Sequence, residues 1–259
     1  MTDYLWPHLT SLPYFRGFLR AIEARLLERI RLEPPRLDVG CGDGHFGSVA
    51  FSTPTDVGMD ADVKSLKEAG RRSAYRILVA GDGGRMPFAS RSFASAVSNS
   101  VLEHIPDVRS VLAEVARLVR PKGRFVFTVP NPGYLEHLSL PDAMARLGAA
   151  RLGQRYEEWF RRITRVQHLV WEEEWAGWLE AAGFEVERSL RYFPPRAMRA
   201  LEWGHYLGLP SLISRRLAGR WILAPTRWNL WLTARALRPY YDSPVAGDGA
   251  FTLYVARRG

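Results

Sequence analysis

A glycine-rich turn after a short apolar segment is the feature that most constrains this chain of 259 residues. Residues 37–47 read L-D-V-G-C-G-D-G-H-F-G, with glycine at positions 40, 42, 44 and 47. Glycines spaced in this way let the backbone approach a ligand closely, as in the first turn of nucleotide-binding βαβ units. The pattern therefore predicts a strand, a ligand-binding turn and a helix in that order.

Short apolar segments alternate with helical segments around this turn. The predicted strands are 36–39, 55–59, 75–80, 93–98, 124–129, 184–190 and 251–256, and the predicted helices between them are 44–51, 63–70, 108–119 and 171–182. Strands that are separated by helical crossovers form a parallel, doubly wound α/β sheet. We therefore expect one domain over residues 1–259.

Three further segments are predicted to be helical. Residues 14–32 form an amphipathic helix, because Phe18, Ile22 and Leu26 recur on one face. The segments 131–170 and 192–250 interrupt the strand–helix alternation, and we expect both to form helical cap insertions.

Composition limits the partners of the chain. No secretory signal is expected from the polar residues Met1–Thr10, and no apolar run is long enough to span a bilayer, so we expect a cytoplasmic location. The single cysteine, Cys41, excludes an internal disulfide and a cysteine metal cluster, and no metal site is predicted. The net charge of +9 indicates either an anionic partner or simply an arginine-rich surface.

The turn favours S-adenosylmethionine over a dinucleotide. A dinucleotide turn requires G-x-G-x-x-G, and here the third position is His45. Asp38, two residues before Gly40, would repel a diphosphate but would attract the ammonium group of S-adenosylmethionine.

Polar residues follow the next three strands as well. Asp60 ends the second strand at the spacing from which a carboxylate binds ribose hydroxyls. Asp82 follows the third strand and could accept a hydrogen bond from the adenine amine, and Asn99 follows the fourth and could reach the amino acid end. Taken alone, Asp60 could equally cap a helix and Asp82 could equally be a turn residue.

Five motifs in order resemble a known family. They are L-D-V-G-C-G-D-G, G-M-D, A-G-D-G-G-R-M-P-F, S-N-S-V-L-E-H-I-P-D and L-V-R-P-K-G-R-F-V-F-T-V-P-N, within residues 35–131, with a weaker echo at 178–186. Together they resemble class I S-adenosylmethionine-dependent methyltransferases, most closely the small-molecule branch of ubiquinone and menaquinone biosynthesis. The resemblance implies a seven-stranded sheet with an antiparallel last strand. It also implies a cofactor site that we predict at Asp38, Gly40, Cys41, Gly42, Asp60, Ala61, Asp82, Gly83 and Asn99.

The catalytic residues and the acceptor are less constrained by the sequence. His168 and His104 are the predicted catalytic residues, as bases near the cofactor, although His104 could equally be a packing residue. Other candidate bases are His137, His205, Tyr134, Tyr156 and Glu136.

We expect methylation of oxygen or carbon on a small or lipid-linked molecule. The arginine- and tryptophan-rich segment 199–238 would form a lid, a peripheral contact with an anionic membrane or a dimer surface. A nucleic-acid substrate is not favoured, because Asn131-Pro132-Gly133-Tyr134 follows the fifth strand rather than the fourth. The alternatives are an RNA methyltransferase and a catalytically inactive cofactor-binding adaptor at a membrane or protein surface.

Overall fold

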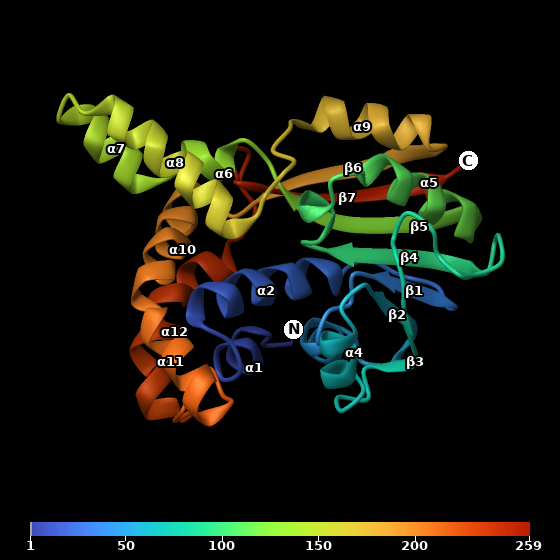
Figure 1. The fold of residues 1–259 in the computed structure, drawn as a ribbon, viewed down its shortest axis with the longest axis horizontal. Helices are drawn as coiled ribbons and strands as arrows, with labels where there is room; N and C mark the ends of the chain where they lie inside the picture. Colours follow the sequence, from blue (N-terminus) through green and yellow to red (C-terminus); the bar gives the residue numbers. More distant parts are fainter. Residues whose placement is uncertain (1) are drawn as a thin grey trace. The chain divides into compact units, whose positions relative to one another are not determined.

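The computed structural model describes residues 2–259 and divides into two compact units (Figure 1). The sheet unit comprises Glu28–Pro132, Val166–Leu190 and Phe251–Gly259, and the helical unit comprises Met1–Leu27, Gly133–Arg165 and Arg191–Ala250. Because three chain segments contribute to each unit, residues far apart in sequence meet in both of them.

The sheet unit contains the predicted α/β sheet. The strands are β1 (Arg36–Val39), β2 (Thr55–Asp60), β3 (Tyr75–Ala80), β4 (Phe93–Asn99), β5 (Val119–Pro130), β6 (Phe184–Tyr192) and β7 (Phe251–Arg258). Their order is β3-β2-β1-β4-β5-β7-β6, in which β1 to β5 pair in parallel and β7 runs antiparallel to β5. The predicted seven-stranded sheet with an antiparallel last strand is thus confirmed.

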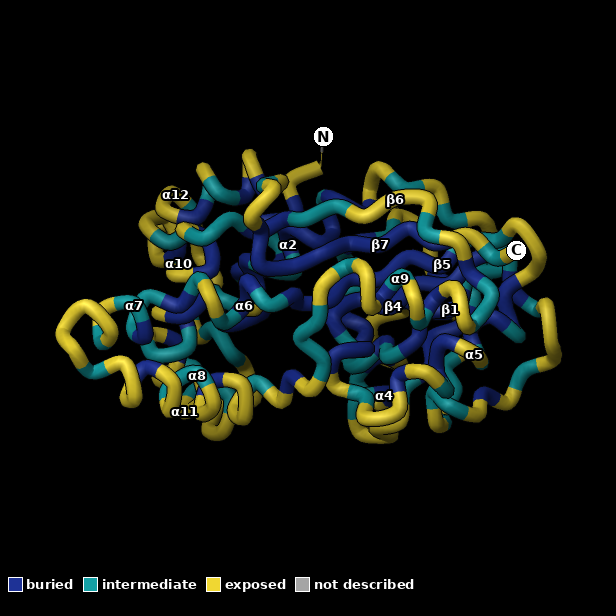
Figure 2. Tube along the Cα trace, turned by 90° about the horizontal axis from the view of Figure 1, so that it is seen from above, coloured by how far each residue is buried: buried dark blue, intermediate teal, exposed yellow. Residues whose placement is uncertain are grey.

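Helices connect the strands of this sheet at the predicted places. They are α3 (His45–Ala50), α4 (Val63–Ala69), the short η1 (Leu102–His104), α5 (Val108–Leu118) and α9 (Glu172–Ala181). Asp62 caps α4 by accepting bonds from two backbone N–H groups, and Asp107 caps α5. The core is aromatic, because Phe127 packs on Tyr254 at 4.8 Å and on Trp175 at 5.3 Å between ring centres. Figure 2 shows the backbone of β5 and β7 as mostly buried.

Strand β5 starts five residues earlier than predicted. The strand was predicted from residue 124, but β5 already pairs with Phe93 through Val119, and the register then shifts before Arg124. Lys122 takes a positive φ of 66° within this irregular stretch. The extra residues therefore form an irregular stretch of β5, which the alternation of apolar and polar residues in the sequence does not reveal.

Most of the described part of the helical unit is helical, and these helices overlap the two predicted insertions in sequence. They are α1 (Leu5–Leu9), α2 (Tyr14–Leu27), α6 (Gly133–Glu136), α7 (Ser139–Arg146), α8 (Ala150–Thr164), α10 (Pro195–Leu207), α11 (Leu209–Ala218) and α12 (Arg227–Asp242). Helix α2 buries Phe18, Ile22 and Leu26 as predicted, but it ends at Leu27 rather than at residue 32. Residues 28 and 29 are exposed and have no apolar surface to bury, so packing does not extend the helix.

A buried tyrosine fixes the start of the sheet. Tyr75, the first residue of β3, donates a hydrogen bond from its hydroxyl to Asp38 Oδ2 on β1 at 2.6 Å. Its ring fills the space beside Gly58 of β2 and Gly47 of α3, and a Cβ atom on Gly58 would lie 2.6 Å from Tyr75 Cδ1. These two glycines therefore leave the space through which the phenol reaches Asp38.

We predict that Gly58→Ala destabilises the sheet unit. The added methyl group would overlap the Tyr75 ring, and overpacking of this kind costs about 1–3 kcal/mol in the free energy of unfolding. Urea denaturation measures that quantity. The matched control is Gly177→Ala in α9, where nothing lies within 4 Å of the added atom and where alanine favours the helix. Equal stability of the two variants would contradict the tight packing at Gly58.

A second prediction concerns alkaline pH. Burial first, and then the charge and hydrogen bond of Asp38, raise the pKa of Tyr75 far above its usual value of 10.0. Above pH 10 the unfolded chain loses the phenolic proton while the native protein keeps it, so the free energy of unfolding falls as the pH rises. Below pH 10 this contribution is fully present.

Tyr75→Phe should therefore flatten the alkaline loss of stability. Between about pH 10 and 12, the free energy of unfolding of the variant should decline less steeply than that of the original protein, by roughly 1.4 kcal/mol per pH unit. Urea denaturation at several pH values measures the slope of each protein. The contributions of the other tyrosines to the slope cancel in the comparison, because both proteins contain them. Parallel slopes would contradict a buried, protonated Tyr75.

Candidate functional site

The predicted cofactor residues meet at one edge of the sheet unit. Asp38 lies near the carboxyl end of β1, Asp60 ends β2, Asp82 follows β3 and Asn99 ends β4. Since β3, β2, β1 and β4 are neighbours in that order, the structure brings these four side chains to the carboxyl edge of four adjacent parallel strands. Ligands of open α/β sheets bind at this edge.

The glycine-rich turn is held in place by backbone hydrogen bonds and by one carboxylate. The N–H groups of Gly40 and Cys41 both donate to the carbonyl of Met59, at 2.8 and 3.0 Å. Asp60 Oδ2 accepts a bond from Gly42 N, and Asp60 Oδ1 accepts one from Asp62 N, both at 2.8 Å. Asp60 therefore ties the turn after β1 to the turn after β2.

Two glycines of the turn have different roles. Gly40 has a φ of +79°, and a Cβ there would lie 2.7 Å from Val101 Cγ2, so close packing requires glycine. Gly42 has a φ of +55°, and nothing lies within 4 Å of its added Cβ position. Gly42 therefore presents bare backbone to open space, as close approach by a ligand requires.

The polar side chains at this edge differ in burial. Asp38 and Asn99 are buried, and Asn99 Oδ1 accepts a bond from Thr128 Oγ1 at 3.0 Å. Asp60 is half-buried, whereas Ala61 and Asp82 are exposed. Asp82 Oδ1 accepts a bond from Gly84 N at 2.9 Å, and Gly83 packs near Val111. The edge thus offers buried anionic and amide groups beside exposed ones.

Cys41 is a buried thiol. Burial first, and then the neighbouring carboxylates of Asp38 and Asp60, raise the pKa of Cys41 far above its usual value of 9.0. A thiol that stays protonated is a poor nucleophile. No group of three His, Cys, Asp or Glu side chains that could hold a metal ion occurs within residues 2–259.

The two predicted catalytic histidines both lie at η1. His104 is the last residue of η1, and His168 contacts Ile105, which follows it. His168 Nε2 lies 2.8 Å from the carbonyl oxygen of Ile105, and the ring packs edge-on against Trp178. A carbonyl only accepts hydrogen bonds, so this contact assigns the proton to Nε2 and, in the neutral ring, leaves the lone pair on Nδ1. His104 is more exposed, and its Nε2 lies 3.7 Å from Glu103 Oε1. His168 is therefore the better oriented of the two.

The other candidate bases belong to the helical unit. His137 Nε2 lies 2.6 Å from the carbonyl of Asp248, and His205 Nδ1 lies 2.9 Å from that of Leu201. Burial lowers the pKa of His205. Tyr156 donates a hydrogen bond to the buried carboxylate of Glu202, which also accepts bonds from Ser139 and Leu140 at the start of α7. Each of the three side chains of His137, His205 and Tyr156 thus contacts another residue of the helical unit.

Tyr75 contacts a residue of this edge, and sequence reasoning missed that contact. Its hydroxyl contacts Asp38 although the two residues are far apart in sequence. Gly58 carried a usable signal, because a glycine inside a strand often marks the close approach of another group. The signal did not identify which side chain fills the space.

Known proteins resemble this chain in fold and in part of the sequence. The solved structure of a possible histamine N-methyltransferase from Thermotoga maritima, described as SAM-dependent, aligns with a TM-score of 0.60 at 15% identity and covers 93% of this chain and 90% of that one. At this identity, the similarity shows the fold.

Two curated relatives share sequence as well. A malonyl-[acyl-carrier protein] O-methyltransferase of Legionella pneumophila is 30% identical over 46% of this chain and 45% of its own length. The 27-O-demethylrifamycin SV methyltransferase of Amycolatopsis mediterranei is 28% identical over 58% of this chain and 68% of its own length. The chain thus spans less than half the length of the first relative.

A family profile described as a methyltransferase domain matches residues 14–189. The match covers more than half of the chain and includes the glycine-rich turn, the acidic edge and His168. The chain therefore belongs to the methyltransferase-domain family, whose methyl donor is S-adenosylmethionine.

Proposed function

We propose that this protein transfers the methyl group of S-adenosylmethionine to an oxygen or carbon atom of a small or lipid-linked molecule. The observation that carries the proposal is the row of Asp38, Asp60 and Asn99 at the carboxyl edge of adjacent strands, beside the open backbone of Gly42. A dinucleotide would bring a diphosphate to the buried carboxylate of Asp38, where like charges repel.

The residues at this edge fit the proposed cofactor. Asp38 would hold the ammonium group, Asp60 the ribose hydroxyls and Asp82 the adenine amine. Gly42 has no atom in the way of a close approach, and each Asp60 oxygen that binds a backbone N–H keeps a further lone pair for a hydroxyl. The remaining contacts would come from Gly40, Cys41, Ala61, Gly83 and Asn99. When bound, S-adenosylmethionine supplies an activated methyl group on a sulfonium.

The protein would contribute orientation and proton removal. Methyl transfer requires the acceptor atom to be held in line with the sulfonium, and a hydroxyl acceptor also requires a base. We infer that His168 accepts that proton at Nδ1, because the carbonyl of Ile105 holds Nε2 as a donor. This orientation keeps the same tautomer in every turnover.

The relatives support the acceptor class without fixing it. The two curated relatives are named as methyltransferases of an acyl-carrier-bound malonyl group and of a rifamycin precursor. An oxygen acceptor on a small or carrier-linked molecule agrees with both names. For a lipid-linked acceptor, we further propose a peripheral contact with an anionic membrane. No helix of residues 2–259 is long and apolar enough to cross a bilayer.

Asp60→Ala should weaken cofactor binding. Charge-assisted hydrogen bonds to the ribose hydroxyls would be lost, at a cost of about 2 kcal/mol or more in binding free energy. Titration calorimetry with S-adenosylhomocysteine measures the dissociation constant. Asp60→Asn keeps an acceptor for Gly42 N, so it separates a disturbed turn from a lost ribose contact.

The matched control for this titration is Asp62→Asn. It removes a negative charge two residues away, and asparagine still caps α4. We expect its dissociation constant to change less than that of either Asp60 variant. Unchanged binding in Asp60→Ala would remove Asp60 from the site. An equal loss of affinity in Asp62→Asn would mean that any nearby negative charge has the same effect, without a specific ribose contact.

His168→Gln should impair methyl transfer to a hydroxyl without weakening cofactor binding. Glutamine can still donate to the carbonyl of Ile105 but cannot accept a proton, and loss of a general base typically lowers turnover by about 10²–10⁴-fold. The assay follows a radioactive methyl group from S-adenosylmethionine into lipid and aqueous extracts of cells that lack the protein. His104→Gln is the comparison, and a larger loss in that variant would transfer the base assignment to His104.

A further inference from the structure

Helix α11 exposes its large apolar residues. Leu209, Leu212, Ile213 and Leu217 lie on one helical face, and all are between 53% and 82% exposed. Ser211, Ser214 and Arg215 on the opposite face are less exposed, and α11 has no buried residue. A surface helix of a globular protein turns its apolar face inward. The reversed arrangement indicates that something else covers this face.

Helix α12 carries a second apolar surface. It packs within the helical unit through Leu230, Leu237 and Tyr241, which are buried. The opposite side exposes Trp228, Trp231 and Leu232 by 79%, 56% and 70%. Large exposed aromatic and aliphatic side chains of this kind mark a binding surface when they gather in one region. A partner that covered both faces would have to accept apolar side chains from each helix.

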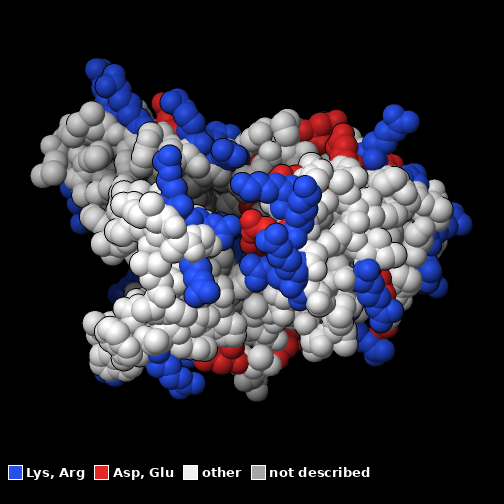
Figure 3. Space-filling model, turned by 60° about the horizontal axis from the view of Figure 1, so that its bottom comes forward, with Lys and Arg blue, Asp and Glu red and all other residues white. Residues whose placement is uncertain are grey.

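The charge of the same region selects the partner. Residues 203–241 contain six arginines and no acidic residue. Arg216, Arg220, Arg227 and Arg235 are exposed. Figure 3 shows that basic side chains also outnumber acidic ones on the face it presents. A second copy of this chain would bring like charge against like charge, and an RNA strand would leave the exposed leucines in water.

Arginines of this region pair with aromatic rings as interfacial side chains do. The guanidinium of Arg235 lies 5.6 Å from the ring of Trp231, and that of Arg215 lies 5.7 Å from the ring of Trp221. Tryptophan and arginine are enriched where apolar and aqueous surroundings meet, because both side chains have an apolar body and a polar end. A lipid surface offers acyl chains for the leucines together with anionic groups for the arginines.

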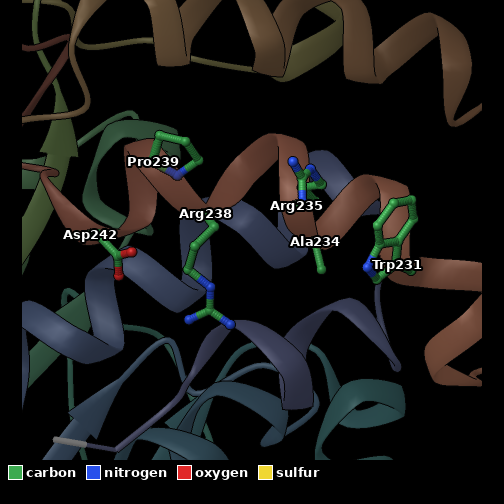
Figure 4. Close-up of a pocket in the computed structure, with 6 residues that line it drawn as sticks. All are labelled: Trp231, Ala234, Arg235, Arg238, Pro239 and Asp242. Carbon is green, nitrogen blue, oxygen red and sulfur yellow. The ribbon is translucent and has the colours of Figure 1, made fainter.

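A pocket lies along α12 beside two of these arginines and one carboxylate. It has a volume of about 480 Å³ and is lined by Trp231, Ala234, Arg235, Arg238, Pro239 and Asp242 (Figure 4). Arg238 forms an ion pair with Asp3 at 2.9 Å, so much of its charge is already balanced. Arg235 lies in no ion pair among residues 2–259. Arg235 is therefore the cation available to a phosphate.

We propose that α11 and α12 dock onto an anionic lipid surface. The exposed leucine, isoleucine and tryptophan side chains enter the boundary between headgroups and acyl chains, and Arg235 binds a headgroup phosphate beside Trp231. This inference names residues for the peripheral membrane contact and does not depend on methyl transfer. Its failure would leave the cofactor titration unaffected.

The test measures binding of the full chain to vesicles by co-sedimentation. Vesicles of phosphatidylcholine mixed with phosphatidylglycerol should bind the protein more tightly than pure phosphatidylcholine, and added salt should weaken the binding. Leu217→Ser should lower the partition coefficient by roughly 10-fold, because the variant lacks a leucine side chain that the lipid would bury on binding. Arg235→Gln should lower it by about 5-fold on mixed vesicles and less on neutral ones.

Matched controls come from elsewhere in the chain. Leu147→Ser changes a leucine that is 84% exposed, against 82% for Leu217, but that lies at the end of α7. Arg188→Gln removes the same charge as Arg235→Gln from an exposed position on β6. Both controls should bind like the original protein.

Four results would overturn the proposal. They are absence of binding to mixed vesicles, an equal loss in Leu147→Ser, a dimer in solution that Leu217→Ser dissociates, and tighter binding to single-stranded RNA than to vesicles through Arg235. Analytical ultracentrifugation detects the dimer, and filter binding detects the RNA.

Discussion

The hydrogen bond between the Tyr75 hydroxyl and Asp38 is the interaction on which the site depends. It joins the first residue of β3 to the carboxylate at the end of β1, across β2, and it is possible only because Gly47 and Gly58 leave room for the phenol. A buried carboxylate without a donor would be costly. Tyr75 therefore supplies a donor to the buried Asp38 carboxylate beside the first turn.

Asp60 links the turn after β1 to the turn after β2. Each of its oxygens accepts a backbone N–H, one from the turn after β1 and one from the turn after β2. Two backbone donors thereby hold the Asp60 carboxylate in one orientation. Because the parallel order β3-β2-β1-β4 places successive strand ends side by side, a few such bonds suffice to align residues from distant parts of the chain.

The same geometry explains what the sequence could predict. Strand ends and glycine turns are local features, so the bounds of β1 and β3 and the places of Asp38, Asp60 and Asn99 followed from the residues themselves. The reach of Tyr75 to Asp38 depends on how three strands align, and no local pattern reports that alignment. The irregular stretch before Arg124 and the early end of α2 at Leu27 likewise depend on packing partners.

Helix α11 shows a further limit of sequence reading. Periodicity identifies an apolar face but does not say whether that face packs inward, because a core helix and an interfacial helix share the same spacing. Exposure resolves the ambiguity: Leu217 is on the surface while Ser211 and Ser214 are more covered. Exposed leucine and isoleucine surface disfavours a helix that stands free in water. A chain that carries this surface together with unbalanced arginines is physically suited to a lipid boundary, where both features lower the free energy at once.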